Sequence, residues 1–404
     1  MTQRRLSILI ICLLFAAACT PTSTNEEATR LAPTLPPLTW QTPGEPITVD
    51  NVAQMQALGW LTQVDTPSTL MDFAVAPDAT RLAAISNTQI IAWDLISGET
   101  VFASGRGDVS QLYYAPDKTE IYGINPAGEV IVFDAETGGI ITAFQGHPAY
   151  FGSAAYHPDD GWLALGGVDG SVKVWDPLER TALATLEAHE QAVTALALSP
   201  DGAALVTTSP DNTVRLWDWR GRALLQEWAL GEQAAQRLAF AQDRVAAGVE
   251  NGALLWAAGD GAALQRFVTD RGGATSILQF SPDGRYLLGG SRAIGMRLWR
   301  MDDYSLLTTL PDVDGASASA RFSPEGDLLV TAAVGVPVLL WNLTQVTGDT
   351  IARAELPIGF NEILNVEWTS DGRLLLFFDA RGTIAVWGIP QAAPTATPPA
   401  QPPA

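Results

Sequence analysis

The sequence predicts an all-β fold, an eight-bladed β-propeller, from three observations. First, a short turn rich in Pro, Asp and Gly occurs eight times and is followed 15 to 18 residues later by an aromatic residue. Second, apolar and polar residues alternate between these points, as in half-buried strands joined by tight turns. Third, the aromatic residues recur every 39 to 46 residues, and such a period is typical of a four-stranded blade. They are Trp93, Phe133, Trp175, Trp217, Trp256, Trp299, Trp341 and Trp387.

The chain begins with a predicted export signal over residues 1–18. Arg4 and Arg5 precede about 13 apolar residues, a run too short to span a bilayer as a stable anchor. The segment from Ala16 to Cys19 resembles a bacterial lipobox, with Ala16 where Leu is preferred. The resemblance implies cleavage immediately before Cys19 and attachment of lipid to its thiol.

Cysteine usage fits this interpretation. Cys12 would leave with the signal, so the mature chain would keep Cys19 alone and could form no intramolecular disulfide. The alternative is an ordinary secreted protein, because Ala-rich segments also suit a general signal peptidase. We expect an exported protein, lipid-anchored to the cell membrane or cell envelope, with the propeller outside the cytoplasm.

Residues 19–46 form a predicted disordered tether. The segment is rich in Thr and Pro and has few bulky apolar residues with which to bury a core. At roughly 3 Å per residue in a polyproline-like conformation, it could hold the propeller tens of ångströms from the bilayer. Residues 390–404 are also rich in Pro and predict a disordered tail.

The propeller is predicted to span residues 47–389 and to close through its N-terminal segment. After Trp387 the chain reaches the Pro-rich tail, so the last repeat lacks an outer strand. Residues 47–61 precede the first repeat and can supply that strand, which would remove two open sheet edges. The fifth repeat, residues 238–267, has a shortened turn, and the alternative without it is a seven-bladed ring.

One repeat carries a pattern of four polar and aromatic residues. His189 precedes its first strand, Thr207 lies on the second, Asp211 in the next turn and Trp217 on the third. This arrangement resembles the WD40-repeat family, and the period extends the resemblance over residues 52–389. In that family the four side chains form a structural tetrad, a buried hydrogen-bonded chain that satisfies polar groups costly to bury alone.

The preceding repeat keeps only part of this pattern. It has His147, Asp169 and Trp175, but Leu165 occupies the position of the hydroxyl residue, which predicts a shorter network. The remaining repeats have lost more of the pattern. The resemblance therefore depends on the period of the whole set, with two strong repeats among weaker ones.

The composition excludes several classes of partner. The formal net charge is -21 with only two lysines, so nucleic acid and anionic lipid head groups are poor partners. The sequences around Asp302 and Asp312 come closest to a calcium loop, and neither matches one. We therefore expect no metal and no cofactor, and contact with a membrane only through the N-terminal lipid.

The sequence contains no recognisable catalytic group. Of its three histidines, His147 and His189 occupy the structural position of the family, and His157 lies in a turn. No nucleophile elbow, zinc-binding His motif or phosphate-binding loop is present. We therefore expect a protein that is not an enzyme.

Partner-binding residues are expected at one mouth of the propeller. The resemblance implies that partners bind where the linker between neighbouring blades enters the innermost strand. Alanine fills four of the eight positions at this rim, so the bulky or charged residues there are the candidates for contact. They are Asp108, Tyr150, Phe151, Arg237, Arg271 and Glu362.

These features predict a monomeric, non-catalytic protein-interaction scaffold of the bacterial cell envelope, whose protein partners the sequence does not identify. One alternative is an extracellular receptor for a small molecule or glycan that uses the propeller channel. An aromatic-lined channel with convergent polar groups would favour that alternative. A further alternative, an envelope-assembly factor, depends on analogy of fold alone.

Overall fold

The computed structural model describes several stretches of the chain. They are residues 39–62, 70–86, 88–105, 108–268, 273–291, 295–310, 318–333, 335–347, 350–358 and 363–391. The chain divides into two compact units, Met1–Pro37 and Leu38–Ala404, and every described residue belongs to the second. The predicted signal, Cys19 and most of the predicted tether and tail lie outside the described residues. No helix in the described stretches is long and apolar enough to cross a membrane.

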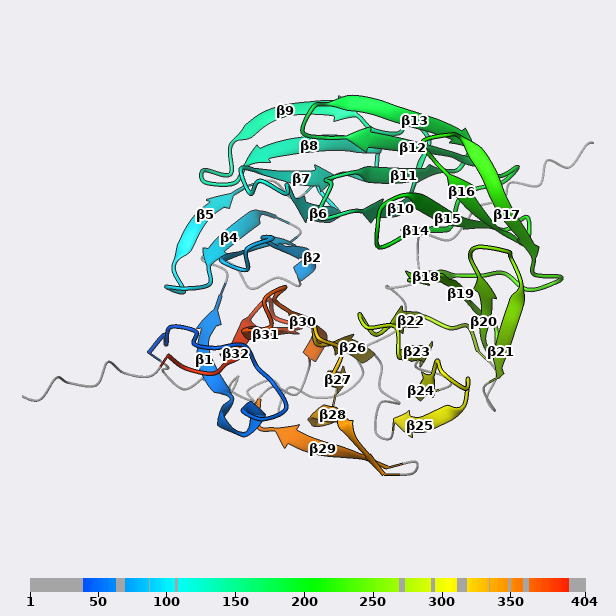
Figure 1. The fold of residues 1–404 in the computed structure, drawn as a ribbon. Coiled ribbons are helices and arrows are strands. Elements are labelled where there is room, and N and C mark those ends of the chain that lie inside the picture. The colour runs from blue at the N-terminus through cyan, green and yellow to red at the C-terminus, as the bar shows by residue number, and fades with distance from the viewer. Residues whose placement is uncertain are drawn as a thin grey trace, which may run out of the picture. The chain divides into compact units, whose positions relative to one another are not determined.

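The described residues form eight sheets of four antiparallel strands, each sheet one blade (Figure 1). Blades 1 to 4 contain β2 (Leu70–Val75), β3 (Arg81–Ser86), β4 (Ile90–Asp94), β5 (Thr100–Ser104), β6 (Gln111–Tyr114), β7 (Glu120–Ile124), β8 (Glu129–Asp134), β9 (Ile140–Gln145), β10 (Tyr150–Tyr156), β11 (Leu163–Gly167), β12 (Ser171–Asp176), β13 (Thr181–Glu187), β14 (Ala195–Leu198), β15 (Ala204–Ser209), β16 (Thr213–Asp218) and β17 (Ala223–Ala229). Blades 5 to 7 contain β18 (Arg237–Ala241), β19 (Arg244–Val249), β20 (Gly252–Ala257), β21 (Ala263–Val268), β22 (Ile277–Phe280), β23 (Tyr286–Ser291), β24 (Gly295–Arg300), β25 (Leu306–Leu310), β26 (Ala318–Phe322), β27 (Leu328–Ala333), β28 (Val338–Thr347) and β29 (Thr350–Leu356). Blade 8 contains β30 (Ile363–Trp368), β31 (Leu374–Asp379), β32 (Ile384–Gly388) and β1 (Gln56–Leu61), which follows a short 3-10 turn, η1 (Val52–Gln54).

The hydrophobic core lies in layers between neighbouring blades. The first strand of each repeat is the innermost strand of its blade. Inner strands of adjacent blades contact each other; for example, β2 contacts β6. Ile85 of blade 1 and Ile131 of blade 2 belong to one buried cluster, and both are fully buried. The alternation of the sequence produces this arrangement, because successive side chains of a strand point to opposite faces of its sheet.

The recurring Pro-Asp turn joins the first and second strands of a blade. In blade 4 the Ser199 hydroxyl donates to Asp201 Oδ1 at 2.6 Å, and the same oxygen accepts the Ala203 N–H at 3.0 Å. Gly202 follows with φ 63°, a left-handed conformation that glycine adopts without steric cost. This turn chemistry explains why the motif recurs at the same point of successive repeats.

The ring closes as the sequence predicts. In the sheet of blade 8, β1 lies outside β32, and the two strands are antiparallel with Leu61 opposite Ile384. Residues 238–267 lie in blade 5, which has its full four strands despite the shortened turn. The prediction of eight blades is confirmed, and the seven-bladed alternative is wrong.

Residues 40–46, here called the strap, pack on the closing blade. The Gln41 N–H donates to the Leu58 carbonyl of β1 at 2.9 Å, and the Gly44 N–H donates to the Ile389 carbonyl at 2.7 Å. The indole N–H of Trp40 donates to the Ile96 carbonyl of blade 1 at 2.8 Å. The strap thus connects the first and last blades.

The strap corrects the predicted limits of the folded unit. The tether was expected to reach residue 46, but the strap belongs to the packed structure. At the other end, Pro390 forms a β-bridge with Pro43, and the Gln391 N–H donates to the Thr42 carbonyl at 2.9 Å. Composition misplaced both limits because proline-rich chain can still pack when its few backbone groups find partners.

Candidate functional site

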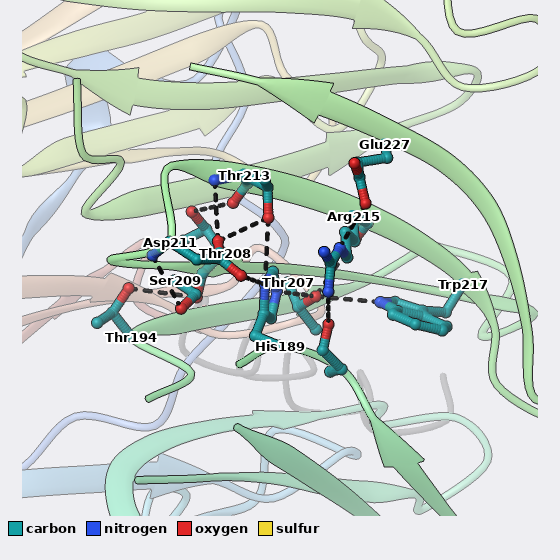
Figure 2. Close-up of polar contacts among 11 residues, drawn as sticks. His189, Thr194, Thr207, Thr208, Ser209, Asp211, Thr213, Arg215, Trp217 and Glu227 are labelled. Atoms are coloured by element: carbon teal, nitrogen blue, oxygen red, sulfur yellow. Dashed lines mark hydrogen bonds and ion pairs between the residues drawn. The ribbon is translucent and has the colours of Figure 1, made fainter. Parts of the chain in front are cut away.

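The four residues of the predicted tetrad are joined in blade 4 (Figure 2). His189 Nδ1 lies 2.9 Å from Asp211 Oδ2, and His189 Nε2 lies 2.8 Å from Thr207 Oγ1. The Trp217 indole N–H donates to the same Thr207 oxygen at 3.1 Å. Two strands, β15 and β16, and the two connections that carry His189 and Asp211 are therefore tied by one chain of hydrogen bonds.

The tetrad is arranged for a neutral histidine. Burial lowers the pKa of His189, and the hydrogen bond to Asp211 offsets this only in part. Burial alone would raise the pKa of Asp211, but hydrogen bonds from Thr213 and His189 outweigh it and lower that pKa. With a proton on Nδ1, His189 donates to Asp211 and accepts the Thr207 hydroxyl at Nε2. Both ring nitrogens of His189, the Thr207 hydroxyl and the Trp217 N–H then each have a hydrogen-bond partner within the tetrad. The tetrad therefore has a structural role.

Other blades hold their tryptophans differently. In blade 3 the position equivalent to Thr207 is Leu165, which has no hydroxyl group. The Trp175 indole N–H donates instead to the Gly146 carbonyl at 2.8 Å. His147 and Asp169 are linked through the Ser171 hydroxyl, which lies 3.0 Å from the ring and donates to the carboxylate at 2.8 Å. This substitute pathway was not foreseen from the sequence.

The predicted rim residues divide between described and undescribed parts of the chain. Asp108 precedes β6, Tyr150 begins β10 and Arg237 begins β18, so all three lie where an inner strand starts. Arg271 and Glu362 lie outside the described residues. Phe151 follows Tyr150 in β10, and the structure describes its backbone only.

The described rim residues do not form one cluster. The Tyr150 hydroxyl donates to Gln111 Oε1 of blade 2 at 2.5 Å. The Arg237 side chain donates through Nε to the Ser276 carbonyl of blade 6 at 2.9 Å. The two residues therefore belong to different sectors of the mouth, and only Tyr150 adjoins the cavity described next.

A cavity of about 750 Å³ lies against the inner strands of blades 8, 1, 2 and 3. At one end it reaches Met71 and Ser110 near the starts of their strands, and at the other it reaches Pro-Asp turns at Pro77 and Pro158. It is therefore a recess in one sector of the channel wall. Its aromatic lining residues are Phe73, Tyr113, Tyr114, Tyr156 and Trp368.

Asp72 is the half-buried acid of this cavity. Its Oδ2 accepts the Leu112 N–H at 2.8 Å, a bond from blade 1 to blade 2. Burial raises the pKa of Asp72 to about 6, although hydrogen bonds from the Leu112 and Phe73 backbones lower it. The carboxyl group is therefore mostly ionised at neutral pH, in surroundings that disfavour its charge.

Two further polar groups of the lining have spare hydrogen-bonding capacity within the described chain. Gln111 uses its carbonyl oxygen to accept from Tyr150, and its amide donors make no bond there. The Tyr113 hydroxyl likewise makes no hydrogen bond with a described residue, whereas that of Tyr156 donates to the Tyr114 carbonyl at 2.7 Å. The recess thus offers donors beside the Asp72 acceptor.

The sequence predicts contact residues at the rim and offers the channel as an alternative binding site, but it identifies no residue of this recess. Asp72 lies in β2 and Tyr113 in β6, five residues beyond the rim residue Asp108, and both are inside strands of alternating pattern. An Asp on an inner strand is unusual for a buried position, and this is the signal that could have drawn attention to it. Among the described residues no group of three His, Cys, Asp or Glu side chains is placed to hold a metal ion.

Comparison with known proteins identifies the repeats. A family model described as "WD domain, G-beta repeat" matches residues 138–176 and 180–218. Over these two stretches the chain carries WD40 repeats. Each match starts just before the outer strand of one blade, β9 or β13, and ends on the third strand of the next, β12 or β16. The second match contains the tetrad.

Similarity beyond these repeats is confined to the fold. No curated protein matches the sequence. The crystal structure of the computationally designed Ika8 protein superimposes with a TM-score of 0.66, at 20% identity, over 81% of this chain and 99% of that one. WD40 propellers commonly mediate protein–protein interactions, and the matched repeats suggest a protein-interaction scaffold in general.

Proposed function

We propose that the protein is a lipid-anchored scaffold of the bacterial cell envelope, which binds a protein partner at the mouth where the inner strands begin. The observation that carries the proposal is the pair of WD40 repeats within a complete eight-bladed ring. Such a ring offers rigid loops at both mouths, and rigid presentation lowers the entropy cost of binding. Tyr150 is the aromatic anchor at this mouth.

The proposed anchor depends on the N-terminal sequence. Two arginines, an apolar run and Cys19 follow one another as in a lipoprotein signal. One acyl chain gives only weak membrane binding, whereas several chains on one residue give stable attachment. A membrane-attached chain would present the propeller to envelope partners.

Site-specific photo-crosslinking in intact cells tests the mouth. A photoreactive amino acid replaces Tyr150 in one variant and Asp159 in its matched control. The two positions flank β10, so they lie at opposite mouths of the same blade, and Asp159 is exposed. We expect a crosslinked protein from position 150 only, identified by mass spectrometry and then tested as a purified partner.

A second pair of variants measures affinity for that purified partner. Arg237→Ala changes the predicted mouth, and Arg222→Ala changes an exposed turn between β16 and β17. We expect Arg237→Ala to weaken binding by about 1 kcal/mol or more and Arg222→Ala to leave it unchanged. Equal crosslinking from both mouths, or none from either, contradicts the proposal.

Fractionation of cells tests the anchor separately. We expect Cys19→Ser to move the protein from the membrane fraction to the soluble fraction, because the serine cannot accept the thioether-linked lipid. Cys12→Ser is the matched control and should stay with the membrane. Retention of Cys19→Ser in the membrane fraction would show that lipid at Cys19 is not the anchor.

A further inference from the structure

The recess beside Asp72 has an unbalanced charge. The charged residues in its lining are Asp72 and Glu367. Glu367 accepts a hydrogen bond from Arg321 Nε at 2.9 Å, so its charge is compensated by blade 7. Asp72 forms no ion pair with any described residue, and its bonds come from backbone N–H groups. The lining therefore carries one uncompensated carboxylate and no Lys, Arg or His.

Aromatic rings line the same recess as this carboxylate. The rings of Tyr113 and Tyr156 lie 4.9 Å apart at 34°, and both line the recess with Trp368. Phe73, the neighbour of Asp72 in β2, stacks on Phe378 at 4.0 Å. Aromatic faces carry negative electrostatic potential, so they attract a cation and not an anion. The carboxylate and the rings thus favour the same kind of ligand.

We propose that this recess binds an organic ammonium group, with Asp72 as its counter-charge and Tyr113 and Tyr156 as its aromatic walls. The recess is large enough for a small molecule, since ligand pockets commonly measure about 300 to 1,000 Å³. The net charge of -21 would also raise the concentration of cations near the surface. The site does not depend on the protein-binding role proposed above.

Other ligand classes fit the recess less well. An anion would meet an uncompensated carboxylate and negative ring faces. A hard metal cation needs several oxygen ligands, and the lining offers only one carboxylate, Asp72, that is not already paired with an arginine. A neutral sugar could stack on the rings but would leave the charge of Asp72 unbalanced.

Calorimetric titration with choline tests the proposal, with 3,3-dimethylbutan-1-ol as the neutral control of the same shape. We expect choline to bind and the neutral compound to bind at least about tenfold more weakly, since one charge interaction is worth that factor. The Asp72→Asn variant should bind choline more weakly than the wild type by the same factor. Tyr113→Leu should also weaken the binding of choline, because it removes an aromatic wall of the recess.

Glu187→Gln is the matched control, because it removes one carboxylate from the exposed outer strand β13 of blade 3. It should bind choline like the wild type. Melting temperatures of all variants establish that each is folded. The proposal would be overturned if choline and its neutral analogue bound equally, or if Asp72→Asn bound choline as tightly as the wild type. It would also be overturned if neither choline nor the lysine peptide introduced below bound at concentrations up to about 10 mM.

A second arm distinguishes the source of the ammonium group. A short peptide with one lysine is compared with the same peptide carrying norleucine, which lacks the charge. Tighter binding of the lysine peptide than of choline identifies the ligand as a side chain of a partner protein. Tighter binding of choline identifies a free small molecule. If neither choline nor the lysine peptide binds, the proposed ammonium site is wrong. That result leaves the crosslinking test of the scaffold unaffected.

Discussion

Tryptophans at the same position of different blades have different partners. In blade 4 the Trp217 indole N–H donates to Thr207, and in blade 7 that of Trp341 donates to Thr331 at 3.0 Å. In blade 8 the Trp387 nitrogen is buried and has no partner among the described residues. The ring of each tryptophan fills the core, but only some add a buried hydrogen bond. Position in the repeat therefore does not determine the energetic role of the residue.

This difference predicts unequal costs for the same substitution. Trp217→Phe should destabilise the protein by about 1 to 2 kcal/mol more than Trp387→Phe, because only the first removes a buried hydrogen bond. Trp217→Ala should cost about 3 to 5 kcal/mol, since it also leaves a large cavity. Chemical unfolding of each variant measures these costs. Equal costs for the two Trp→Phe variants, or an unchanged melting temperature for Trp217→Ala, would contradict the tetrad.

Asp72 predicts a substitution that stabilises the protein. Its folded pKa of about 6 lies above the ordinary value of 3.8, so the folded state binds the proton more tightly than the unfolded state. The stability associated with this proton is fully present below pH 3.8 and is lost as pH rises through 6. Asp72→Asn avoids that loss and can still accept from Leu112 through its amide oxygen.

We therefore expect Asp72→Asn to raise stability at pH 7 to 8 by about 1 to 2 kcal/mol, after allowance for partial exposure. The gain should shrink between pH 6 and 4. Thermal unfolding across this pH range gives the measurement, with Glu187→Gln as the exposed control. A gain independent of pH would show that the charge of Asp72 is not its cause. A carboxylate kept at a cost to stability fits a binding role.

The tetrad could be predicted at the residue scale, but the recess could not. His189, Thr207 and Asp211 lie within one repeat, so a local pattern contains the whole network. Asp72 and Tyr113 come from different blades, and Trp368 lies almost 300 residues further along the chain. Their proximity depends on closure of the ring, which no local pattern specifies.

At the scale of elements, the strap is held by a close contact between an aromatic ring and two glycines. A Cβ atom added to Gly59 of β1 would lie 2.2 Å from the Trp40 ring, and one added to Gly98 would lie equally close. Gly98 also has φ 75°, whereas Gly59 has an ordinary backbone conformation. Gly59 is therefore the position at which side-chain space alone can be tested.

A double-mutant cycle tests this contact. Gly59→Ala should destabilise the wild type by about 1 to 3 kcal/mol, because its methyl group would displace the Trp40 ring. In a Trp40→Ala background the same change should cost much less, since the ring is absent. Unfolding free energies of the four proteins give the coupling energy. A coupling energy near zero would show that Trp40 does not pack against β1 in solution.

The elements of the blades were more predictable than the strap. Strands repeat eight times, so the period is visible even where a single repeat is weak, as in blade 5. The strap occurs once, and its contacts depend on Trp40 meeting glycines of two distant segments. Composition could identify the region as rich in proline but could not locate where packing begins.

At the scale of the whole molecule, closure of the ring stabilises the folded propeller and the net negative charge destabilises it. The ring leaves no repeat at an open end, because β1 of the N-terminal segment completes blade 8. The net charge of -21 opposes compaction through repulsion among carboxylates. Ion pairs such as Arg81–Glu136 and Lys118–Asp78 lie at the surface, where each contributes little. Repulsion should therefore dominate the response of the protein to salt.

Raising NaCl from about 10 mM to about 150 mM should increase the melting temperature at pH 8 by about 2 to 4 °C, the effect of roughly 1 kcal/mol. The Debye length falls from about 30 Å to about 8 Å, which screens carboxylates on different blades from one another. At pH 5, closer to the sequence pI of 4.4, the same addition should have a smaller effect, because less net charge remains to be screened. Calorimetry at the two pH values provides the comparison. A melting temperature that falls with salt at pH 8 would show that surface ion pairs outweigh the repulsion.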